Sequence, residues 1–304
     1  MRTERNEDPA PGGAVRSENS APRGAVEIAA SCSGVVKIYW TETSDVHALK
    51  GIDAHFPKAA VTAVVGPSGA GKSSLLRILA GLDAPTAGTV HIDGTEIGGL
   101  SAGRLRKVRG ERVGYVFQRP SDNLISYLDV IGHVRLAARL RGVDARDEAE
   151  PLLEMLGLSE RWDHLPHQLS GGEQQRLAFA QAVVGSPAVV IADEPTAQLD
   201  SRSAAGLLDC VVDLAHRGIA FVISTHDRQV VETADTTLHL RHGSVEAESR
   251  GHAALAVIDA FGRVQLPPET LDWFPDRRAV IEVEDGSLRI TPPSVLEHRR
   301  GDAS

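Results

Sequence analysis

The sequence predicts an α/β fold with an inserted helical subdomain and a small C-terminal β domain. Three observations support this prediction. Short apolar strands alternate with helical patterns from residue 26 to about residue 247. A mostly helical stretch at about 124–168 interrupts the alternation. Beyond residue 248 the pattern changes to short strands, and Asp285-Gly286 marks a tight hairpin between the last two.

The first part of the chain gives a clear order of elements. Residues 1–25 are rich in Pro, Gly, Ser, Ala and charge, so we expect a disordered leader there. The strand ending at residue 92 meets Asp93-Gly94, which is a hairpin signal. We expect strands at 27–29, 34–39, 61–65 and 89–92, and a helix at 73–80.

The second part continues the alternation. Pro151 suits the first turn of a helix within the helical stretch. A helix between two buried strands is expected to begin near Asp200 or Ser201 and to stop at Gly218. We place a domain boundary between about 245 and 255. The expected strands are 189–192, 220–224, 257–259, 264–266, 280–284 and 287–290.

Composition excludes several classes of protein. The chain has 304 residues, 42% of them hydrophobic, and a formal net charge of −9, so it can bury a full core. Cys32 and Cys210 are far apart in sequence, which excludes a disulfide framework or structural zinc site and fits a reducing compartment. No apolar run is long enough for a membrane span, and the charged N-terminus is unlike a secretory signal. The acidic balance argues against binding nucleic acid through bulk charge.

One glycine-rich stretch fits the phosphate-loop pattern G-x-x-x-x-G-K-[ST] without a mismatch, and it lies between an expected strand and an expected helix. Its glycines let backbone N–H groups surround an anion, and the helix N-terminus adds partial positive charge. We expect Lys72 to reach the β- and γ-phosphates and the Ser73 hydroxyl to bind Mg²⁺. The sequence therefore predicts a phosphate-loop NTPase core. The stretch reads Gly66-Pro67-Ser68-Gly69-Ala70-Gly71-Lys72-Ser73.

Two further motifs accompany the phosphate loop. Asp193 and Glu194 follow an apolar strand. An acidic strand end is common by itself, but beside a phosphate loop Asp193 would hold magnesium and Glu194 would polarise the attacking water. Ser170-Gly171-Gly172-Glu173 begins a helix and forms a second anion-binding helix start. One nucleotide hardly needs two anion-binding helix N-termini, so the second would bind the nucleotide of another subunit. Considered without the other motifs, however, this sequence is better explained as an ordinary helix N-cap.

Together these motifs resemble the nucleotide-binding subunit of an ATP-binding cassette (ABC) ATPase over about residues 26–247. Residues 66–73 resemble its Walker A motif, 169–176 its signature and 189–195 its Walker B motif. The resemblance makes Gln118 the Q-loop glutamine and His226 the switch histidine. Asp200 is the acid of a D-loop in which Ala197-Gln198 replaces the usual Ser-Ala or Gly-Asn. Tyr39 matches the aromatic residue that stacks on adenine, with Trp40 beside it as the alternative.

The resemblance implies a set of roles for these residues. Glu194, His226 and Lys72 would be catalytic, and Ser73, Gln118 and Asp193 would bind the metal. Ser170, Gly171, Gly172 and Glu173 would contact the second subunit's ATP. The implied ATP-binding residues are Tyr39, Gly66, Pro67, Ser68, Gly69, Ala70, Gly71, Lys72, Ser73, Ser74 and Gln118.

The function implied is an ATP-hydrolysing transporter subunit that powers a separate membrane permease through ATP-driven closure of a head-to-tail homodimer. The cofactors implied are ATP and Mg²⁺. The protein would be cytoplasmic, peripheral on the inner face of the cell membrane, with no nucleic-acid partner. Residues 46–52, 81–88 and 169–176 look like the lipoprotein-releasing and macrolide-export branch. Residues 119–133 depart from that branch where it normally meets the membrane partner, so the partner and cargo stay open.

Other functions compete with this interpretation. An ABC ATPase that drives a non-transport membrane regulator would carry identical motifs. A soluble ABC protein acting on nucleic acid or the ribosome fits less well, because such members carry two cassettes or long inserted coiled coils. A non-enzymatic nucleotide binder is the remaining class.

The C-terminal part resembles a different family. Residues 258–269 are similar to the opening of AbrB-type swapped-hairpin domains, and the hairpin at 280–290 fits the end of such a domain. Residues 251–304 carry 9 acids and 6 Lys or Arg residues, which favours a dimerising or regulatory role over DNA binding; a purely structural appendage explains them as well as regulation does. The expected division is a leader at 1–25, the ABC domain at 26–247, a small β domain at 252–293 and a tail at 294–304.

Overall fold

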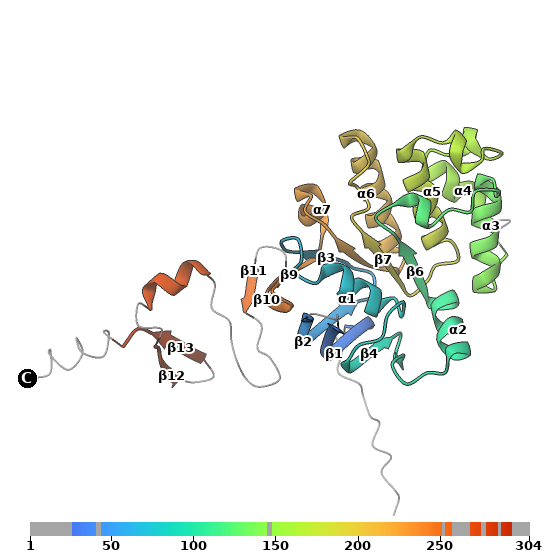
Figure 1. Cartoon of the computed structure of the whole chain (residues 1–304). Coiled ribbons are helices and arrows are strands. Elements are labelled where there is room, and N and C mark those ends of the chain that lie inside the picture. Colours follow the sequence, from blue (N-terminus) through green and yellow to red (C-terminus); the bar gives the residue numbers. More distant parts are fainter. Residues whose placement is uncertain are drawn as a thin grey trace, which may run out of the picture.

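The computed structural model describes residues 26–40, 44–144, 148–250, 253–256, 268–274, 278–284 and 287–293. Its centre is a seven-stranded sheet in the order β11-β10-β9-β3-β8-β7-β6, which helices flank (Figure 1). The five strands from β9 to β6 are parallel, and β10 and β11 join antiparallel at one edge. The strands are β3 Val61–Val65, β6 Val113–Val116, β7 Val189–Asp193, β8 Ala220–Ser224, β9 Thr236–Arg241, β10 Ser244–Arg250 and β11 Ala253–Ala256.

The central strands are buried on both faces. In β7 and β8 every residue is buried except Asp193, at the carboxyl end of β7, which is half-buried. Parallel strands are covered on both sides, so their sequences are continuous apolar runs rather than alternating ones. The expected strands at 61–65, 189–192 and 220–224 are therefore confirmed, and a polar residue at the end of such a run is placed at the edge of the sheet.

A second, antiparallel sheet has the order β2-β1-β4-β5. The helix α1 (Lys72–Leu79) contacts strands of both sheets, and its residues Leu75, Leu76, Ile78 and Leu79 are fully buried. The expected helix at 73–80 is thus confirmed within one residue. The expected strands at 27–29 and 34–39 form one long strand with bulges. The strands of this sheet are β1 Ile28–Trp40, β2 Asp45–Pro57, β4 Ala87–Ile92 and β5 Thr95–Glu96.

Helices α3 to α7 pack into one apolar cluster with strands β7 and β8, whereas Leu105 and Val108 of α2 pack against the cluster that contains α1. Pro151 lies in the first turn of α4, and Asp200 caps the N-terminus of α6, as the sequence predicts. Gly218 follows α6 with φ of 107°, a left-handed conformation that glycine adopts without strain. The helices are α2 Ala102–Arg112, α3 Val130–Arg141, α4 Ala149–Met155, α5 Gly171–Val183, α6 Ser201–His216 and α7 Arg228–Thr233, and the 3₁₀ turns are Pro120–Asp122, Ser159–Arg161, Pro166–Gln168 and Pro268–Trp273.

The C-terminal part is described only in pieces. The expected hairpin is present as β12 (Val280–Glu284) and β13 (Ser287–Thr291), which pair antiparallel. The expected strands at 257–259 and 264–266, the leader at 1–25 and the tail at 294–304 lie outside the described residues. The edge strand β11 carries the large sheet to Ala256, four residues into the range assigned to the C-terminal domain. The division into domains stays a prediction.

Among the described residues, none of the helices combines the length and the apolar character that a lipid bilayer crossing requires.

Candidate functional site

The phosphate loop connects the carboxyl end of β3 to the N-terminus of α1. Gly71 has φ of 104°, and a Cβ at this position would lie 2.5 Å from the carbonyl oxygen of Ala48. Gly66 is also in the left-handed region, and a Cβ there would collide with the Leu240 carbonyl oxygen. Both glycines are therefore required by local conformation and by close approach of neighbouring strands. Gly69, with φ of 77°, has open space around it.

A cavity of about 670 Å³ lies over this loop. It brings together segments that are far apart in sequence: Tyr39, the loop itself, Gln118, the pair Asp193 and Glu194, and His226. The strand order explains this meeting, because β3, β8 and β7 are neighbours and their carboxyl ends share one edge of the sheet. The full lining is Tyr39, Val46, His47, Ala48, Gly66, Pro67, Ser68, Gly69, Ala70, Gly71, Lys72, Ser73, Ser74, Gln118, Asp193, Glu194 and His226.

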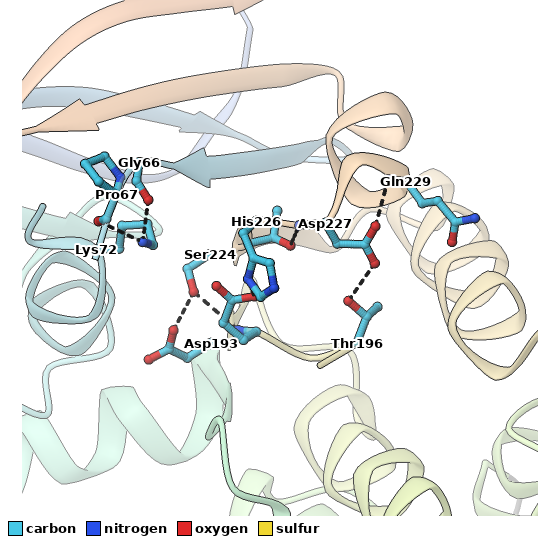
Figure 2. A network of polar contacts seen from close by, with 11 residues as sticks. Gly66, Pro67, Lys72, Asp193, Thr196, Ser224, His226, Asp227 and Gln229 are labelled. Carbon is cyan, nitrogen blue, oxygen red and sulfur yellow. Dashed lines mark hydrogen bonds and ion pairs between the residues drawn. The ribbon is translucent and has the colours of Figure 1, made fainter. Parts of the chain in front are cut away.

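Lys72 points back over the phosphate loop. Its Nζ donates to the carbonyl oxygens of Gly66 at 2.7 Å and Pro67 at 3.2 Å (Figure 2). These neutral acceptors hold the ammonium group above the mouth of the loop without cancelling its charge. The loop thus presents a cation and a helix N-terminus to the same cavity, which is the arrangement that favours a bound polyphosphate.

The two acids after β7 have different environments. The Asp193 carboxylate accepts a hydrogen bond from the Ser224 hydroxyl at the end of β8. Glu194 has φ of 49°, and its backbone N–H donates to the Ser224 carbonyl oxygen at 3.0 Å. A left-handed conformation is costly for a non-glycine residue and is common at functional positions. The turn therefore aims the two carboxylates differently although they are adjacent in sequence.

His226 faces Glu194 across the cavity edge. Its Nδ1 lies 2.9 Å from Glu194 Oε2, and the side chains are 78% and 12% exposed. The hydrogen bond to Glu194, and the charge of that carboxylate, raise the pKa of His226 above its usual value. The pair therefore joins a nearly buried carboxylate to an exposed imidazole that can carry a proton.

Residues behind this pair fix its backbone. Asp227 accepts hydrogen bonds from the Thr196 hydroxyl at 3.0 Å and from the Gln229 N–H at 2.9 Å, and its own N–H donates to Thr225 Oγ1 at 2.9 Å. Figure 2 shows this network beside His226. It ties the turn after β7 to the start of α7, so that Glu194 and His226 are held from both sides.

Tyr39, near the end of β1, lines the cavity. Its hydroxyl is 3.1 Å from Asp83 Oδ2 and 3.3 Å from Ser74 Oγ, and the Lys37 ammonium group lies 4.8 Å from the centre of its ring. Lys37 also pairs with Asp83 at 2.7 Å, which lowers the pKa of that carboxyl against the opposing effect of burial. Trp40, the alternative aromatic residue, is 68% exposed and does not line the cavity.

The second helix start lies outside this cavity. Ser170 caps α5 by accepting the Glu173 N–H at 3.2 Å, and Glu173 Oε2 accepts the Ser170 N–H at 2.8 Å, which is a capping box. Arg161 binds Glu173 at 2.8 Å, and this hydrogen bond lowers the pKa of Glu173 to about 2. The ordinary N-cap, which the sequence offered as the alternative interpretation of this helix start, is present at Ser170. Gly171 and Gly172 lie beside Gln198 and Leu199 of the expected D-loop.

Asp200 also lies apart from the cavity. Its carboxylate accepts from the N–H groups of Arg202 and Ser203, both at 3.0 Å, and from the Ser203 hydroxyl at 2.7 Å. These hydrogen bonds lower its pKa. In a single chain, then, neither the signature turn nor the D-loop acid lines the cavity over the phosphate loop.

Sequence reasoning missed part of the site. Val46, His47 and Ala48 of β2 line the cavity, and Ser224 orients Asp193. The stretch 46–52 entered the sequence analysis only as a mark of the branch, and it was given no place in the site, because that place depends on how the antiparallel sheet folds over the loop. Ser224 is the last residue of an apolar strand, and this position was the one sequence feature that could have indicated its role in orienting Asp193.

Comparison with known proteins agrees with this geometry. The family model described as "ABC transporter" matches residues 49–197. The chain is 40% identical to the lipoprotein-releasing system ATP-binding protein LolD of Bacteroides thetaiotaomicron over 204 residues, which cover 66% of this chain and 93% of that protein. It is 40% identical to the macrolide export ATP-binding/permease protein MacB 1/2 of Paracoccus denitrificans, covering 73% of this chain and 34% of that protein.

Among solved structures, the ATP-binding cassette MJ0796 has the same architecture. That protein was solved as a dimer in a post-hydrolysis state bound to ADP and Pi. It shares 32% identity and a TM-score of 0.69 with this chain, covering 74% of this chain and 99% of that one. Fold and site together define an ATPase with an α/β core and a phosphate loop. More specifically, the chain belongs to the ABC transporter family.

Proposed function

We propose that this chain is the ATP-hydrolysing subunit of a transporter whose membrane permease is a separate chain. The observation that carries the proposal is the single cavity that joins the phosphate loop to Gln118, Asp193, Glu194 and His226. The similarity to LolD, described as an ATP-binding protein of a lipoprotein-releasing system, supports the transport role. A permease-bound ATPase of this kind works as a peripheral protein on the inner face of the cell membrane.

The residues in the cavity suit ATP with Mg²⁺. Ser73, Gln118 and Asp193 offer hydroxyl, amide and carboxylate oxygens in one cavity, and oxygen ligands are what Mg²⁺ prefers. The described residues hold no cluster of three acids, histidines or cysteines that could cage a metal alone, which fits an ion bound partly by phosphate and water. We assign adenine to Tyr39 and the phosphates to residues 66–74. Bound Mg²⁺ supplies neutralisation of the phosphate charge.

The mechanism follows from the positions of the side chains. Lys72 stabilises negative charge on the terminal phosphate. Glu194 accepts a proton from the attacking water, because its carboxylate lies at the cavity and, among the residues that the structure describes, pairs only with His226. His226 donates to the γ-phosphate and orients Glu194. Asp193, held by Ser224, keeps its carboxylate toward the metal position.

We propose further that catalysis requires two copies arranged head to tail. Ser170, Gly171, Gly172 and Glu173 lie outside the cavity of their own chain, so they can complete only the ATP site of a sister chain. Asp200 would lie at the same dimer interface. The dimeric MJ0796 structure supports this assembly. ATP-driven closure and reopening of such a dimer would move the permease.

Replacement of Glu194 by glutamine tests the catalytic assignment. The variant Glu194→Gln keeps the size of the side chain but cannot accept the proton, so ATP binding should persist while turnover is lost. The matched control is Glu232→Gln, because Glu232 is an exposed acid on α7 that pairs with Arg228 and does not line the cavity. Turnover of Glu194→Gln at the parental rate would contradict the general-base role.

Substitution at Gly171 tests the dimer separately. Gly171 is exposed and a Cβ there meets only Gln198 Oε1, at 3.6 Å, so Gly171→Asp should fold normally. Its carboxylate would repel the partner's triphosphate. We expect ATP-dependent dimers of Glu194→Gln on a sizing column, and loss of these dimers when Gly171→Asp is added, with ATP binding retained. Dimers that persist would overturn the head-to-tail arrangement.

For the C-terminal part we propose a dimerising or regulatory domain of AbrB type over residues 252–293. The antiparallel pair of β12 and β13 supports the last hairpin of such a domain. Measuring the ATPase rate and the oligomeric state of the chain truncated after residue 256 tests this role. If neither changes, the domain is a structural appendage only.

A further inference from the structure

Two charged residues outside the nucleotide cavity support Tyr39, which lines it. They are Lys37 on β1 and Asp83, which follows α1, and neither residue lines the cavity. Their Nζ and Oδ1 atoms are 2.7 Å apart, and the two side chains are 12% and 24% exposed. An ion pair this sheltered differs from the exposed pairs of a protein surface, which contribute little. Its position behind Tyr39 indicates a role at the site.

Asp83 uses both of its carboxylate oxygens. Oδ1 accepts from Lys37 Nζ and from the Ala84 N–H at 2.8 Å, and Oδ2 accepts from the Tyr39 hydroxyl at 3.1 Å. The Lys37 ammonium group also donates to the Ala84 carbonyl oxygen at 2.9 Å. These hydrogen bonds hold Lys37 and Asp83 in one arrangement, so the carboxylate is a fixed acceptor for the hydroxyl end of the Tyr39 ring.

The pair also fixes the plane of the Tyr39 ring. The Lys37 ammonium group lies over one face of the ring, 4.8 Å from its centre, a distance at which a cation is attracted to an aromatic face. The ring cannot turn about its long axis without losing this contact. Because Tyr39 lines the cavity and Lys37 does not, the opposite face of the ring is the one left for a base.

Val46 of β2 extends the free face of the ring. It is the cross-strand partner of Tyr39, lines the same cavity and is 49% exposed. Directly opposed residues on neighbouring antiparallel strands project to the same side of a sheet. Tyr39 and Val46 therefore present adjoining apolar surfaces to the cavity, which suits a planar aromatic base.

The same contacts tie Tyr39 to the helix that carries the lysine of the phosphate loop. The Tyr39 hydroxyl lies 3.3 Å from Ser74 Oγ, in the first turn of α1 behind Lys72. Near the other end of α1, the Asp83 N–H donates to the Arg77 carbonyl oxygen at 3.2 Å. A nucleotide that contacts both the ring and the phosphate loop would find the two at a fixed separation. Such preorganisation lowers the cost of binding.

We propose that Lys37 and Asp83 are positioning residues for the nucleotide base, which hold the Tyr39 ring with its free face toward the cavity before ATP arrives. This role rests on the proposed function in one respect, the assignment of adenine to Tyr39. Neither residue touches ATP, so both act through Tyr39. Their contribution should therefore appear for a ligand that carries a base and be absent for a bare triphosphate chain.

The experiment compares two ligands of the full chain by isothermal titration calorimetry with Mg²⁺ present. One ligand is a non-hydrolysable ATP analogue, and the other is inorganic tripolyphosphate, which offers phosphates without a base. Lys37→Met keeps the aliphatic stem but removes the cation, and Asp83→Asn removes the negative charge that holds Lys37. Each should weaken binding of the analogue about tenfold, or about 1.4 kcal/mol, which is within the range for a base stacked on an aromatic side chain. Tripolyphosphate should bind each variant as tightly as it binds the parent.

A double variant and two matched controls make the test specific. Tyr39→Ala measures the full contribution of the ring, and adding Lys37→Met to it should weaken binding of the analogue no further, because the lysine then has no ring to position. The controls are Lys58→Met and Asp93→Asn. Lys58 pairs with Asp93 at 3.1 Å, both side chains are 35% exposed, and neither residue lines the cavity. Both controls should bind both ligands as the parent does.

The outcomes separate this role from the proposed function. If Tyr39→Ala weakens binding of the analogue while Lys37→Met and Asp83→Asn do not, the positioning role is wrong and the adenine assignment stands. If Tyr39→Ala leaves that affinity unchanged, the adenine assignment fails and the positioning role fails with it. Equal losses for the analogue and tripolyphosphate, or additive losses in the double variant, would show a merely structural effect and would also overturn the proposal.

Discussion

Replacement of Gly71 by alanine probes the contact between the phosphate loop and the second sheet. Gly71 has φ of 104°, and an added Cβ would lie 2.5 Å from Ala48 O and 2.9 Å from Leu49 Cδ2. Two costs arise. A left-handed alanine costs about 1–2 kcal/mol, and forcing a methyl group into a filled site costs about 1–3 kcal/mol. We expect Gly71→Ala to lower the free energy of unfolding by about 2–5 kcal/mol.

Gly69→Ala is the matched control in the same loop. Gly69 has φ of 77° but open space around it, so only the backbone cost of about 1–2 kcal/mol applies. The difference between the two variants isolates the packing of β2 against the loop. Urea unfolding of the nucleotide-free protein measures both values, because the midpoint shifts with stability when the slope is constant. Equal destabilisation by the two variants would refute the close approach of Ala48.

Three further predictions concern titrating and thiol groups. The hydrogen bond to Glu194 is the main cause of the raised pKa of His226. The pair therefore stabilises the folded protein fully below the unfolded pKa of histidine, about 6.5, and this stabilisation is lost as the pH rises through the pKa of the folded protein. In Glu194→Gln, NMR titration should show a lower pKa for His226. The pKa of Glu173 near 2 gives stability that is present above the unfolded value of about 4.3 and lost as the pH falls toward 2. In Arg161→Met, NMR titration should find that pKa raised, and an unchanged value would contradict the ion pair. Burial raises the pKa of the Cys32 thiol to about 12. A thiol reagent at pH 8 should therefore leave Cys32 unlabelled in the folded protein and label it in urea. Rapid labelling of the folded chain would show that this thiol is accessible.

The sequence predicted the elements of the core well because their signals are local. The apolar run at 189–192 and the glycines of the phosphate loop fix a strand, a turn and a helix start within a few residues. The cap at Asp200 and the early position of Pro151 were predicted for the same reason. The expected break between residues 29 and 34 was wrong, because β1 runs through it as one strand with bulges; pairing with β2 overrides the weak local pattern.

The family resemblance predicted that these residues share one ATP site, but the local patterns in the sequence do not explain how they meet. No spacing along the chain places β8 between β3 and β7, and that order is what brings His226 to Glu194. The contribution of Val46, His47 and Ala48 was missed, since those residues enter the site through the folding of another sheet over the loop.

By itself, the sequence determined the local chemistry: a glycine turn that can surround phosphate, a lysine above it, two acids at a strand end and a serine cap on α5. Each depends on neighbours within one turn or one strand, where backbone geometry alone fixes the result. Only the tertiary structure decided which of these groups line one cavity and which lie outside it. Those facts depend on strand order and helix packing, which join residues that no sequence pattern links.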